Sequence, residues 1–331
     1  MIPATMKAIE FSAGGGPEVI RVVERPVPQP GPGEVLVKVA AAGLNRADSQ
    51  QRKGFYPPPP GASDFPGLEI SGTIVGRGDN TQDYDDAAPV CALLTGGGYA
   101  EYAVVPEGQL FPVPRGVSLV DAAALPEVAS TVWSNLGMTA HVKKGEWVLI
   151  HGASGGIGTM AVQVCAALGA KPIVTGSSAE KLAYALDLGA VAGINYREED
   201  FAARVLELTD GHGADVILDV VGAKYLEKNV ASLALEGRMV VIGLLGGRKA
   251  ELDMGQVLSR RLSIQGTTLR SRSVEAKADI VAATFDAVWP LIEAGQVTVP
   301  VDKTFALEDA QAAHEYFETG QFHGKILLTV E

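Results

Sequence analysis

The sequence predicts an α/β protein in which a doubly wound parallel sheet is joined to a β-rich domain. Up to about residue 105, short apolar segments alternate with glycine- and proline-rich turns, which is typical of β structure with irregular connections. From Trp147 onward, strand-like apolar runs alternate with helical periodicity, which indicates βαβ units. A glycine cluster follows the first of those runs, between Gly152 and Gly158.

Length and composition limit the number of domains, the class of protein and the kinds of partner. A chain of 331 residues favours two domains, and 47% hydrophobic with 20% charged residues describes an ordinary globular protein. A net charge of −12 argues against nucleic acid or an anionic membrane as the main partner. Two cysteines cannot build a disulfide framework, and no apolar run reaches the roughly 18 residues of a membrane span, so we expect a cytoplasmic protein.

The first part of the chain is expected to contain mainly strands. They are predicted at residues 6–11, 19–23, 35–42, 70–75 and 100–105. A short helical segment is expected at 45–52, followed by Tyr56 and a stiff surface loop of four prolines. Residues 118–136 carry helix signals, and Pro126 is expected to begin a second helix there.

The second part reads as alternating strands and helices. Strands are expected at residues 147–150, 172–176, 190–195, 216–221, 239–243 and 262–266. Helices are expected at 157–168, 179–188, 201–208, 225–235 and 274–293. The tail from residue 297 returns to β character, with a helix at 307–318 and a strand at 326–330. We expect this tail to fold back onto the N-terminal module.

The glycine cluster has the context of a dinucleotide site. Gly152, Gly155 and Gly158 form G-x-x-G-x-x-G between a predicted strand and a predicted helix. Glycines allow the tight turn and the close approach of the backbone to a pyrophosphate, and the helix N-terminus supplies free N–H groups. The turn therefore predicts a Rossmann domain that binds a nicotinamide dinucleotide.

The end of the second Rossmann strand indicates which nucleotide binds. NAD-binding units usually place an acidic residue there to hold the ribose 2′-hydroxyl, but residues 174–178 read Val-Thr-Gly-Ser-Ser. Serine hydroxyls and the ammonium of Lys181 would instead stabilise a 2′-phosphate. NADPH is therefore favoured over NADH, although Lys181 could also be an ordinary solvated lysine.

No metal site is expected. The five histidines form no H-x-x-x-H pair and accompany no C-x-x-C motif, and two cysteines cannot make a four-cysteine zinc lobe. His151, at the end of the first Rossmann strand, is most simply a packed core residue.

Several segments together resemble one known family. They are Leu-Asn-Arg-Ala-Asp at 44–48, the Tyr56 and Pro-Pro-Pro-Gly segment at 51–61, Pro-Gly-Leu-Glu at 66–69, Gly-Tyr-Ala-Glu-Tyr at 98–102, the glycine turn, and Gly-Lys-Ile at 324–326. From end to end the chain is similar to the zinc-free quinone oxidoreductases of the medium-chain dehydrogenase/reductase superfamily, in the branch of the p53-inducible quinone oxidoreductase. Where zinc alcohol dehydrogenases carry a ligand cysteine, this chain has Asn45, and Leu68 replaces their ligand histidine.

The resemblance implies a domain division and a set of site residues. It implies a GroES-like catalytic domain from residues 1–125 and 297–331, and an NADPH-binding Rossmann domain from residues 126–296. Asn45 and Tyr56 are the implied catalytic pair beside the nicotinamide and the quinone, although Tyr56 could simply pack on the prolines and Tyr196 could simply cap its strand. The implied cofactor contacts are Asn45, Thr131, Gly152, Gly155, Gly156, Ile157, Gly158, Gly176, Ser177, Lys181, Tyr196, Gly222, Gly243, Leu244, Leu245, Leu269, Arg270, Ser271 and Lys325.

The function expected from these features is hydride transfer from NADPH to a quinone or similar electron-poor acceptor bound between the two domains, without zinc. Two alternatives remain open: an enoyl or alkenal double-bond reductase, and an NADPH-binding redox sensor with little turnover. Residues 262–268 read as an edge strand with alternating apolar residues, which invites pairing into a homodimer.

Overall fold

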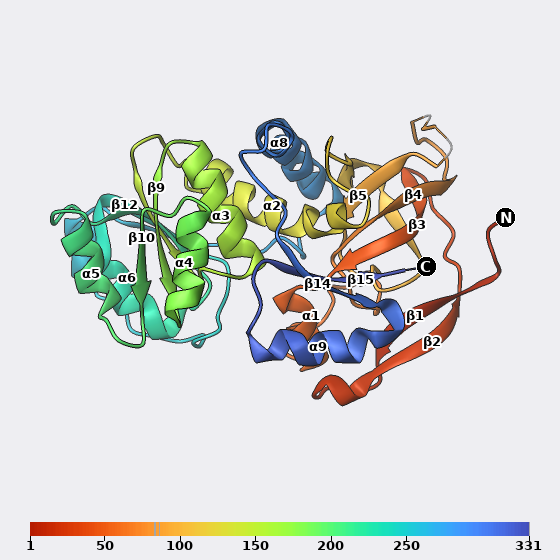
Figure 1. Ribbon diagram of the computed structural model, residues 1–331, viewed down its shortest axis with the longest axis horizontal. Helices are drawn as coiled ribbons and strands as arrows, with labels where there is room; N and C mark the ends of the chain where they lie inside the picture. The colour runs from red at the N-terminus through yellow and green to blue at the C-terminus, as the bar shows by residue number, and fades with distance from the viewer. Residues whose placement is uncertain (83, 86, 331) are drawn as a thin grey trace. The chain divides into compact units, whose positions relative to one another are not determined.

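The computed structural model describes residues 1–82, 84–85 and 87–330, so Glu331, the last residue of the predicted tail, lies outside the described part. The chain divides into two compact units, as its length predicted (Figure 1). The first unit contains Met1–Ser130, Leu269–Glu293 and Val299–Glu331. The second contains Thr131–Thr268 and Ala294–Thr298. Each unit has its own sheet, which confirms the predicted fold class.

The first unit is organised around a sheet in the order β14-β15-β3-β4-β5-β7, with β6 also paired to β3. The strands of this sheet are β3 (Glu34–Gly43), β4 (Glu69–Arg77), β5 (Pro89–Leu93), β6 (Tyr102–Pro106), β7 (Leu110–Pro112), β14 (Val301–Ala306) and β15 (Lys325–Thr329). Because β15 pairs antiparallel with β3, with Leu328 opposite Ala42, the C-terminal tail folds back onto the N-terminal module as expected. The separate pair β1 (Thr5–Phe11) and β2 (Ile20–Pro26) is antiparallel.

Helical segments complete this unit. They are η1 (Pro17–Val19), α1 (Arg46–Arg52), η2 (Glu107–Gln109), η3 (Asp121–Ala124), α2 (Pro126–Val132, which reaches into the second unit), α8 (Val274–Glu293), η6 (Leu307–Asp309) and α9 (Ala310–Thr319). Apolar side chains from β3, β4, β15 and α9 share one buried core, which includes Val37, Ile70 and Phe317. Burial of this core fixes the ends of β3 and β4, from which the polar residues described below emerge.

The second unit is a six-stranded sheet in the order β10-β9-β8-β11-β12-β13, with every pair of neighbours parallel. The strands are β8 (Trp147–His151), β9 (Lys171–Gly176), β10 (Ala192–Asn195), β11 (Ala214–Asp219), β12 (Leu233–Val241) and β13 (Ser263–Gly266). The chain runs outward from β8 through β9 and β10, then returns to β11 beside β8 and continues the other way. This reversal makes the carboxyl ends of β8 and β11 the switch point of the sheet, where ligands of such folds bind.

Helices cover both faces of this sheet: α3 and α4 lie on one face, and α5 and α6 on the other (Figure 1). The helical segments of the unit are η4 (Trp133–Thr139, a π-helix), α3 (Gly156–Ala167), α4 (Ala179–Asp187), α5 (Phe201–Leu208), η5 (Ala223–Tyr225), α6 (Leu226–Ser232) and α7 (Met254–Ser259). Among the described residues, no helix is long and apolar enough to cross a membrane.

Residues 269–293 belong to the first unit, whereas the sequence placed them in the Rossmann domain. The reason is the buried face of α8. Trp289 stacks on Phe111 with ring centroids 4.2 Å apart, and its indole N–H donates to the Pro112 carbonyl at 2.8 Å. The periodicity of α8 was correctly predicted, but periodicity does not say which sheet a helix covers.

Several predicted segments also have different bounds; the strand predicted at 239–243, for example, is β12 (Leu233–Val241). The helix expected at 225–235 ends at Ser232, because Leu233 begins β12 and pairs with Ala214 of β11. Leu233 is fully buried in the core of the second unit, so packing overrides its helix propensity. The helical region at 118–136 is divided into η3, α2 and η4.

Candidate functional site

The glycine turn of the second unit has the backbone that the motif requires. Gly152 has φ +94°, in the region that side chains other than glycine disfavour. A Cβ on Gly158 would lie 1.8 Å from the Gly152 carbonyl oxygen, so that position accepts no side chain. Gly155 is the N-cap of α3, and a Cβ added there would meet none of the described heavy atoms within 4 Å. The turn is therefore closely packed on its inner side and open at Gly155.

The start of α3 fits an anionic group. Gly155 supplies no side-chain cap, and there is no acidic residue in the first turn of α3. Uncapped N–H groups at a helix N-terminus attract phosphate. Gly156 and Ile157 form this first turn and are partly exposed, whereas Gly158, one position further, is buried.

The predicted 2′-phosphate residues meet at the ends of β9 and β10. Tyr196 donates its backbone N–H to the Gly176 carbonyl at 3.2 Å, which joins the two strand ends. Ser178 caps α4 by accepting the Lys181 backbone N–H, so the first turn of α4 carries Lys181 beside Ser177. The Tyr196 side chain is 41% exposed and therefore accessible to a ligand. Gly176 and Tyr196 are thus joined at the ends of β9 and β10, and Ser177 and Lys181 follow β9 along the chain; their contact with a 2′-phosphate stays a prediction.

The loops after β11 and β12 form the other side of the switch point. Asp219, at the end of β11, accepts the backbone N–H of Val221 at 2.7 Å and of Gly222 at 3.0 Å. Burial raises the pKa of Asp219, although these two N–H groups oppose the rise. Gly222 has φ +77°, which glycine adopts without strain, and the Asp219 contacts hold this turn in place.

The neighbouring loop after β12 lies against this turn. A Cβ on Gly243 would lie 2.8 Å from the Val220 carbonyl oxygen, so the two loops touch through their backbones. The following apolar residues, Leu244 and Leu245, are 50% and 59% exposed. The two exposed leucines form an apolar surface after β12.

The remaining predicted cofactor residues lie elsewhere. Thr131 opens the second unit, and its carbonyl accepts the Asn135 side-chain N–H at 2.7 Å. The segment Leu269 to Ser271 belongs to the first unit. Arg270 is buried there, and its guanidinium donates to the Thr95 carbonyl at 2.8 Å and to Gln51 Oε1 at 2.7 Å.

Arg270 also holds the loop of Tyr56. It donates to the Tyr56 carbonyl at 3.3 Å, and its guanidinium carbon lies 5.4 Å from the centroid of the Tyr56 ring. Burial, and secondarily the charge of Glu127, raises the pKa of the Tyr56 hydroxyl. Tyr56 is therefore held by a cation as well as by the proline loop, and its phenol is a weak acid.

Asn45 connects three elements. Its backbone N–H donates to Asp48 Oδ2 at 2.8 Å, which caps α1. Its side-chain N–H donates to Glu69 Oε1 at 2.8 Å, and its side-chain oxygen accepts Lys325 Nζ at 2.7 Å. The amide nitrogen also donates to the Gly43 carbonyl at 3.3 Å, so the side-chain oxygen and both amide N–H groups of Asn45 have partners within the first unit.

The Lys325 ammonium is fully bonded to groups of the first unit. Its ammonium donates to the Leu44 carbonyl at 3.0 Å, to Asn45 Oδ1 at 2.7 Å and to Glu69 Oε1 at 2.5 Å. An ammonium has three N–H donors, so none is left for a cofactor. The structure therefore argues against the predicted cofactor contact by this side chain.

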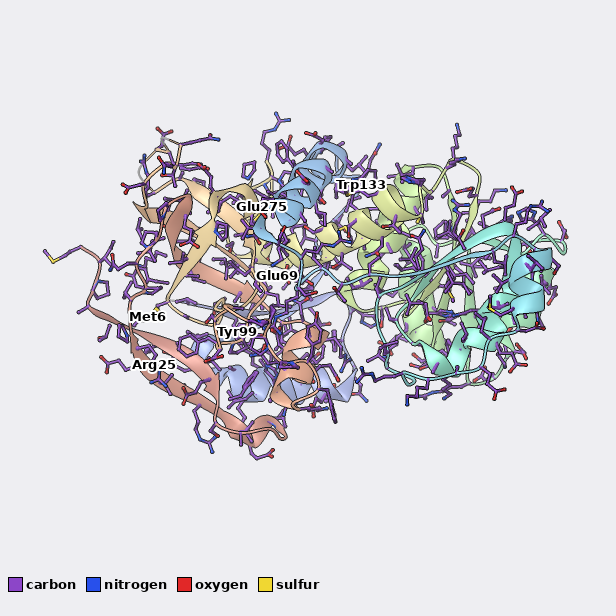
Figure 2. All side chains as sticks on the ribbon, turned by 180° about the vertical axis from the view of Figure 1, so that it is seen from behind. Met6, Arg25, Glu69, Tyr99, Trp133 and Glu275 are labelled. Atoms are coloured by element: carbon purple, nitrogen blue, oxygen red, sulfur yellow. The ribbon has the colours of Figure 1, made fainter. Side chains whose placement is uncertain are left out.

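A buried aspartate supports the same region. Asp48 accepts the Gly67 backbone N–H at 3.1 Å and the Tyr99 hydroxyl at 3.1 Å. Burial raises the pKa of Asp48, while these donors and the Asn45 N–H oppose the rise. Tyr99 and Glu69, labelled in Figure 2, lie among the strands of the first unit.

Two residues were missed by the sequence reasoning. Glu127 lies in the first turn of α2, and its backbone N–H donates to Glu69 Oε2 at 2.8 Å. Lys277 is 2% exposed and donates to the Thr95 hydroxyl. A signal existed for each: Glu127 is the sole charged residue in the apolar stretch 122–132, and Lys277 falls on the buried stripe of α8.

Potential metal ligands are scattered over both units. Within the described ranges, no group of three or more histidine, cysteine, aspartate or glutamate side chains could hold a metal ion. Glu69 is bound on both oxygens, by Asn45 and Lys325 on Oε1 and by the Glu127 N–H on Oε2.

Comparisons with known proteins agree with this architecture. Residues 31–115 match the alcohol dehydrogenase GroES-like domain, and residues 156–284 match the zinc-binding dehydrogenase family. A quinone oxidoreductase of Pseudomonas aeruginosa is 35% identical over 97% of this chain and 99% of its own length. A quinone oxidoreductase of Homo sapiens is 31% identical over 98% of this chain and 97% of its own length.

A solved structure shows the same likeness. The crystal structure of Escherichia coli quinone oxidoreductase complexed with NADPH has a TM-score of 0.88 at 32% identity, and the match covers 98% of this chain and 99% of that one. Because these matches cover almost the whole chain, they apply to both units. The chain belongs to the quinone oxidoreductase family of the medium-chain dehydrogenases/reductases.

Proposed function

We propose that this protein is an NADPH-dependent oxidoreductase that passes a hydride to a quinone or a similar electron-poor acceptor. The family supports this reaction, and a second similar structure, of a mycobacterial protein complexed with NADPH, has a TM-score of 0.88. The observation that carries the proposal is the glycine turn beside an acid-free strand end: residues 174–178 contain no carboxylate to repel a 2′-phosphate.

Each part of the proposed cofactor site has a defined task. Gly152, Gly155 and Gly158 let the backbone approach the pyrophosphate, and Ser177 with Lys181 binds the 2′-phosphate. NADPH, when bound, supplies the hydride. Gly243 and the exposed pair Leu244 and Leu245 border the nicotinamide end.

On the side of the first unit, Asn45 and Tyr56 orient the acceptor. Asn45 is fixed by its contacts to Glu69 and Lys325, and Tyr56 is fixed by Arg270. Residues held in this way keep their geometry without reorganisation during a reaction. Lys325 acts in this proposal by holding Asn45.

The reaction is proposed to proceed without zinc. The donor set at the relevant positions supports this, because Asn45 and Leu68 are poor zinc ligands and Glu69 is already bound by Lys325. Metal analysis of the purified protein, together with activity in a chelator, tests it: activity that requires stoichiometric zinc would contradict the proposal.

The activity test follows NADPH oxidation at 340 nm with 9,10-phenanthrenequinone, 1,4-benzoquinone and crotonyl-CoA in parallel. We expect turnover with the quinones. Turnover with crotonyl-CoA alone would favour the enoyl reductase alternative, for which an enoyl reductase structure at 25% identity and a TM-score of 0.87 provides some support. Tight NADPH binding with no turnover on any acceptor would favour the redox sensor.

We further propose a cytoplasmic homodimer that pairs through β13. This strand lies at the end of the sheet order, and Ser263, Gln265 and Gly266 on it are exposed or partly exposed. Both cysteines are buried free thiols, which suits a reducing compartment. Gel filtration with light scattering tests the dimer, and a mass of 34.5 kDa, that of a single chain, would contradict it.

A further inference from the structure

The first unit contains a carboxyl group that its structural network does not use. Glu69, Asp48 and Glu127 are three carboxyl groups of one electrostatic cluster. Glu69 is paired with Lys325 and Asn45, and Asp48 accepts bonds from Asn45, Gly67 and Tyr99. Among the described residues, neither a hydrogen bond nor an ion pair reaches the Glu127 carboxyl group. It is also partly exposed, whereas Glu69 is fully buried.

Within the part of the chain that the structure describes, no cation is hydrogen-bonded to or ion-paired with the Glu127 carboxyl group, although Lys325 and Lys277 act on it from a greater distance. Lys325 gives its three donors to Leu44, Asn45 and Glu69, and Arg270 gives donors to Thr95, Tyr56 and Gln51. Lys277 is the other buried cation of the cluster, and its ammonium is bonded to the Thr95 hydroxyl. Ionised Glu127 would therefore face Glu69 and Asp48 without a direct counter-charge, a situation in which carboxyl groups retain their proton.

The charged and titratable groups that interact electrostatically with Glu127 come from several elements. They are Asp48 of α1, Tyr56 of the following loop, Glu69 of β4, Lys325 of β15, and Arg270 with Lys277 from the start of the α8 region. Burial first, and the charge of Glu69 second, raises the pKa of Glu127 to about 8, while Lys325 and Lys277 oppose the rise. Glu127 therefore holds a proton at neutral pH and couples electrostatically to Tyr56.

We propose that Glu127 is the proton donor of the reaction, giving its carboxyl proton to the acceptor bound beside Tyr56. This rests on the proposed quinone reduction. A quinone that receives a hydride gains two electrons and one proton, and one of its oxygens becomes a hydroquinone oxyanion. The O–H bond of Glu127 breaks, the proton forms the second hydroquinone O–H bond, and the carboxylate regains a proton from water through its exposed side. The sum is NADPH, quinone and one proton giving NADP⁺ and hydroquinone.

The central test combines a titration with kinetics on the full-length protein. Carbon-13 NMR of glutamate δ-carboxyl groups should show one group that titrates near pH 8, and the Glu127→Gln variant should lack it. With 9,10-phenanthrenequinone, the wild-type kcat should fall as the pH rises past that value. In Glu127→Gln, kcat should fall by about 100-fold, which is the usual effect of removing a general acid. The decrease of kcat at alkaline pH (the alkaline limb of the pH profile) should also disappear. The Kd for NADPH, measured by fluorescence titration, should change less than about 2-fold.

Two further variants sharpen the result. Glu227→Gln is the matched control, because Glu227 is also a first-turn helix glutamate but is exposed in the second unit, and it should keep the wild-type pH profile. Lys277→Met removes a cation that holds down the pKa of Glu127, so the alkaline limb of the kcat profile should move to higher pH. This shift is readable even if Glu127→Gln fails to fold.

Several outcomes overturn the assignment. Wild-type glutamates that all titrate below about pH 6 contradict the held proton, irrespective of activity. A Glu127→Gln enzyme with wild-type kcat and an unchanged alkaline limb contradicts the donor role while leaving quinone reduction intact. Absence of any quinone turnover in the wild type refutes the proposed function instead, and the NMR titration then still decides whether Glu127 holds a proton.

Discussion

Lys325 Nζ lies 2.5 Å from Glu69 Oε1, although 256 positions separate the two residues in the chain. The pair joins β15 to the first residue of β4, and both side chains are buried. Because Glu69 also accepts the backbone N–H of Glu127 and the side-chain N–H of Asn45, this one ion pair sets the positions of the two residues that we place beside the acceptor.

Breaking that pair should destabilise the first unit strongly. Lys325→Met leaves the Glu69 carboxylate buried without its cation, and we expect a loss of about 3–5 kcal/mol in the free energy of unfolding. Lys7→Met is the matched control, since its pair with Glu308 is exposed and should contribute about 0–1 kcal/mol. Urea unfolding monitored by circular dichroism measures both, and equal losses in the two variants would contradict the assigned role.

The two ends of the glycine turn should respond differently to alanine. At Gly158, a Cβ would meet the Gly152 carbonyl oxygen at 1.8 Å, so Gly158→Ala should lower the melting temperature and abolish NADPH binding. At Gly155, a Cβ meets no described heavy atom within 4 Å, so Gly155→Ala should keep the melting temperature but weaken NADPH binding by placing a methyl group where the pyrophosphate approaches. Thermal melts and fluorescence titration separate the two effects. Unchanged NADPH affinity in Gly155→Ala would remove the turn from the cofactor site.

Lys181 should determine preference for the phosphorylated cofactor. Lys181→Ala removes one charge-assisted bond to the 2′-phosphate, worth about 1.5–3 kcal/mol, so the Kd for NADPH should rise by about 10- to 100-fold. The Kd for NADH should not change, since NADH has no 2′-phosphate. Lys143→Ala, at an exposed position before β8, is the control and should alter neither constant. A parallel loss for both cofactors would indicate that Lys181 supports the fold of α4 rather than the phosphate.

His314 should make the protein sensitive to acid. It is buried between Phe11 and Tyr99, and neither ring nitrogen has a hydrogen-bond partner among the described residues. Burial lowers the pKa of His314 from 6.5 to about 3. Between these two values the unfolded chain binds the proton and the folded chain does not. The stability that His314 permits is therefore complete above pH 6.5 and lost as the pH falls toward 3.

The size of this effect can be measured by variant comparison. From pH 7 to pH 5 the wild type should lose about 2 kcal/mol through His314, and His314→Phe should lose that much less. Urea unfolding at both pH values provides the comparison. If the free energy of unfolding falls equally from pH 7 to pH 5 in the wild type and in His314→Phe, the prediction is contradicted.

Tyr56 should position the acceptor rather than protonate it. Its raised pKa makes the phenol a poor acid at neutral pH, and its ring is already held by Arg270. Tyr56→Phe should therefore keep most of kcat and raise the KM for the quinone. A collapse of kcat with unchanged NADPH affinity would transfer the proton role from Glu127 to Tyr56.

Local patterns in the sequence identified the second unit almost completely. The strand from Trp147, the glycine turn and the helix after it depend on neighbours within about 20 residues, and the predicted helix at 201–208 matches α5 (Phe201–Leu208). The proposed 2′-phosphate contacts Ser177 and Lys181 came from the second Rossmann strand end, whereas Tyr196 came from the family resemblance, and their cofactor role stays a prediction. Where a buried contact overrode propensity, as for Leu233 at the start of β12, the prediction was wrong.

Charge placement was decided by tertiary structure. Lys325, Glu69, Asn45 and Glu127 come from four separate stretches, and their pairing depends on how β15 packs beside β3 and how α2 begins next to β4. The sequence marked the positions of Asn45 and Lys325 but did not show that the two bond to each other and to Glu69, nor that the Glu127 carboxyl has no hydrogen-bond partner among the described residues. Sequence periodicity determines which elements form; only the packed chain determines which charges are buried together, because the energy of a charge depends on its distances to all the others and on the water that burial removes.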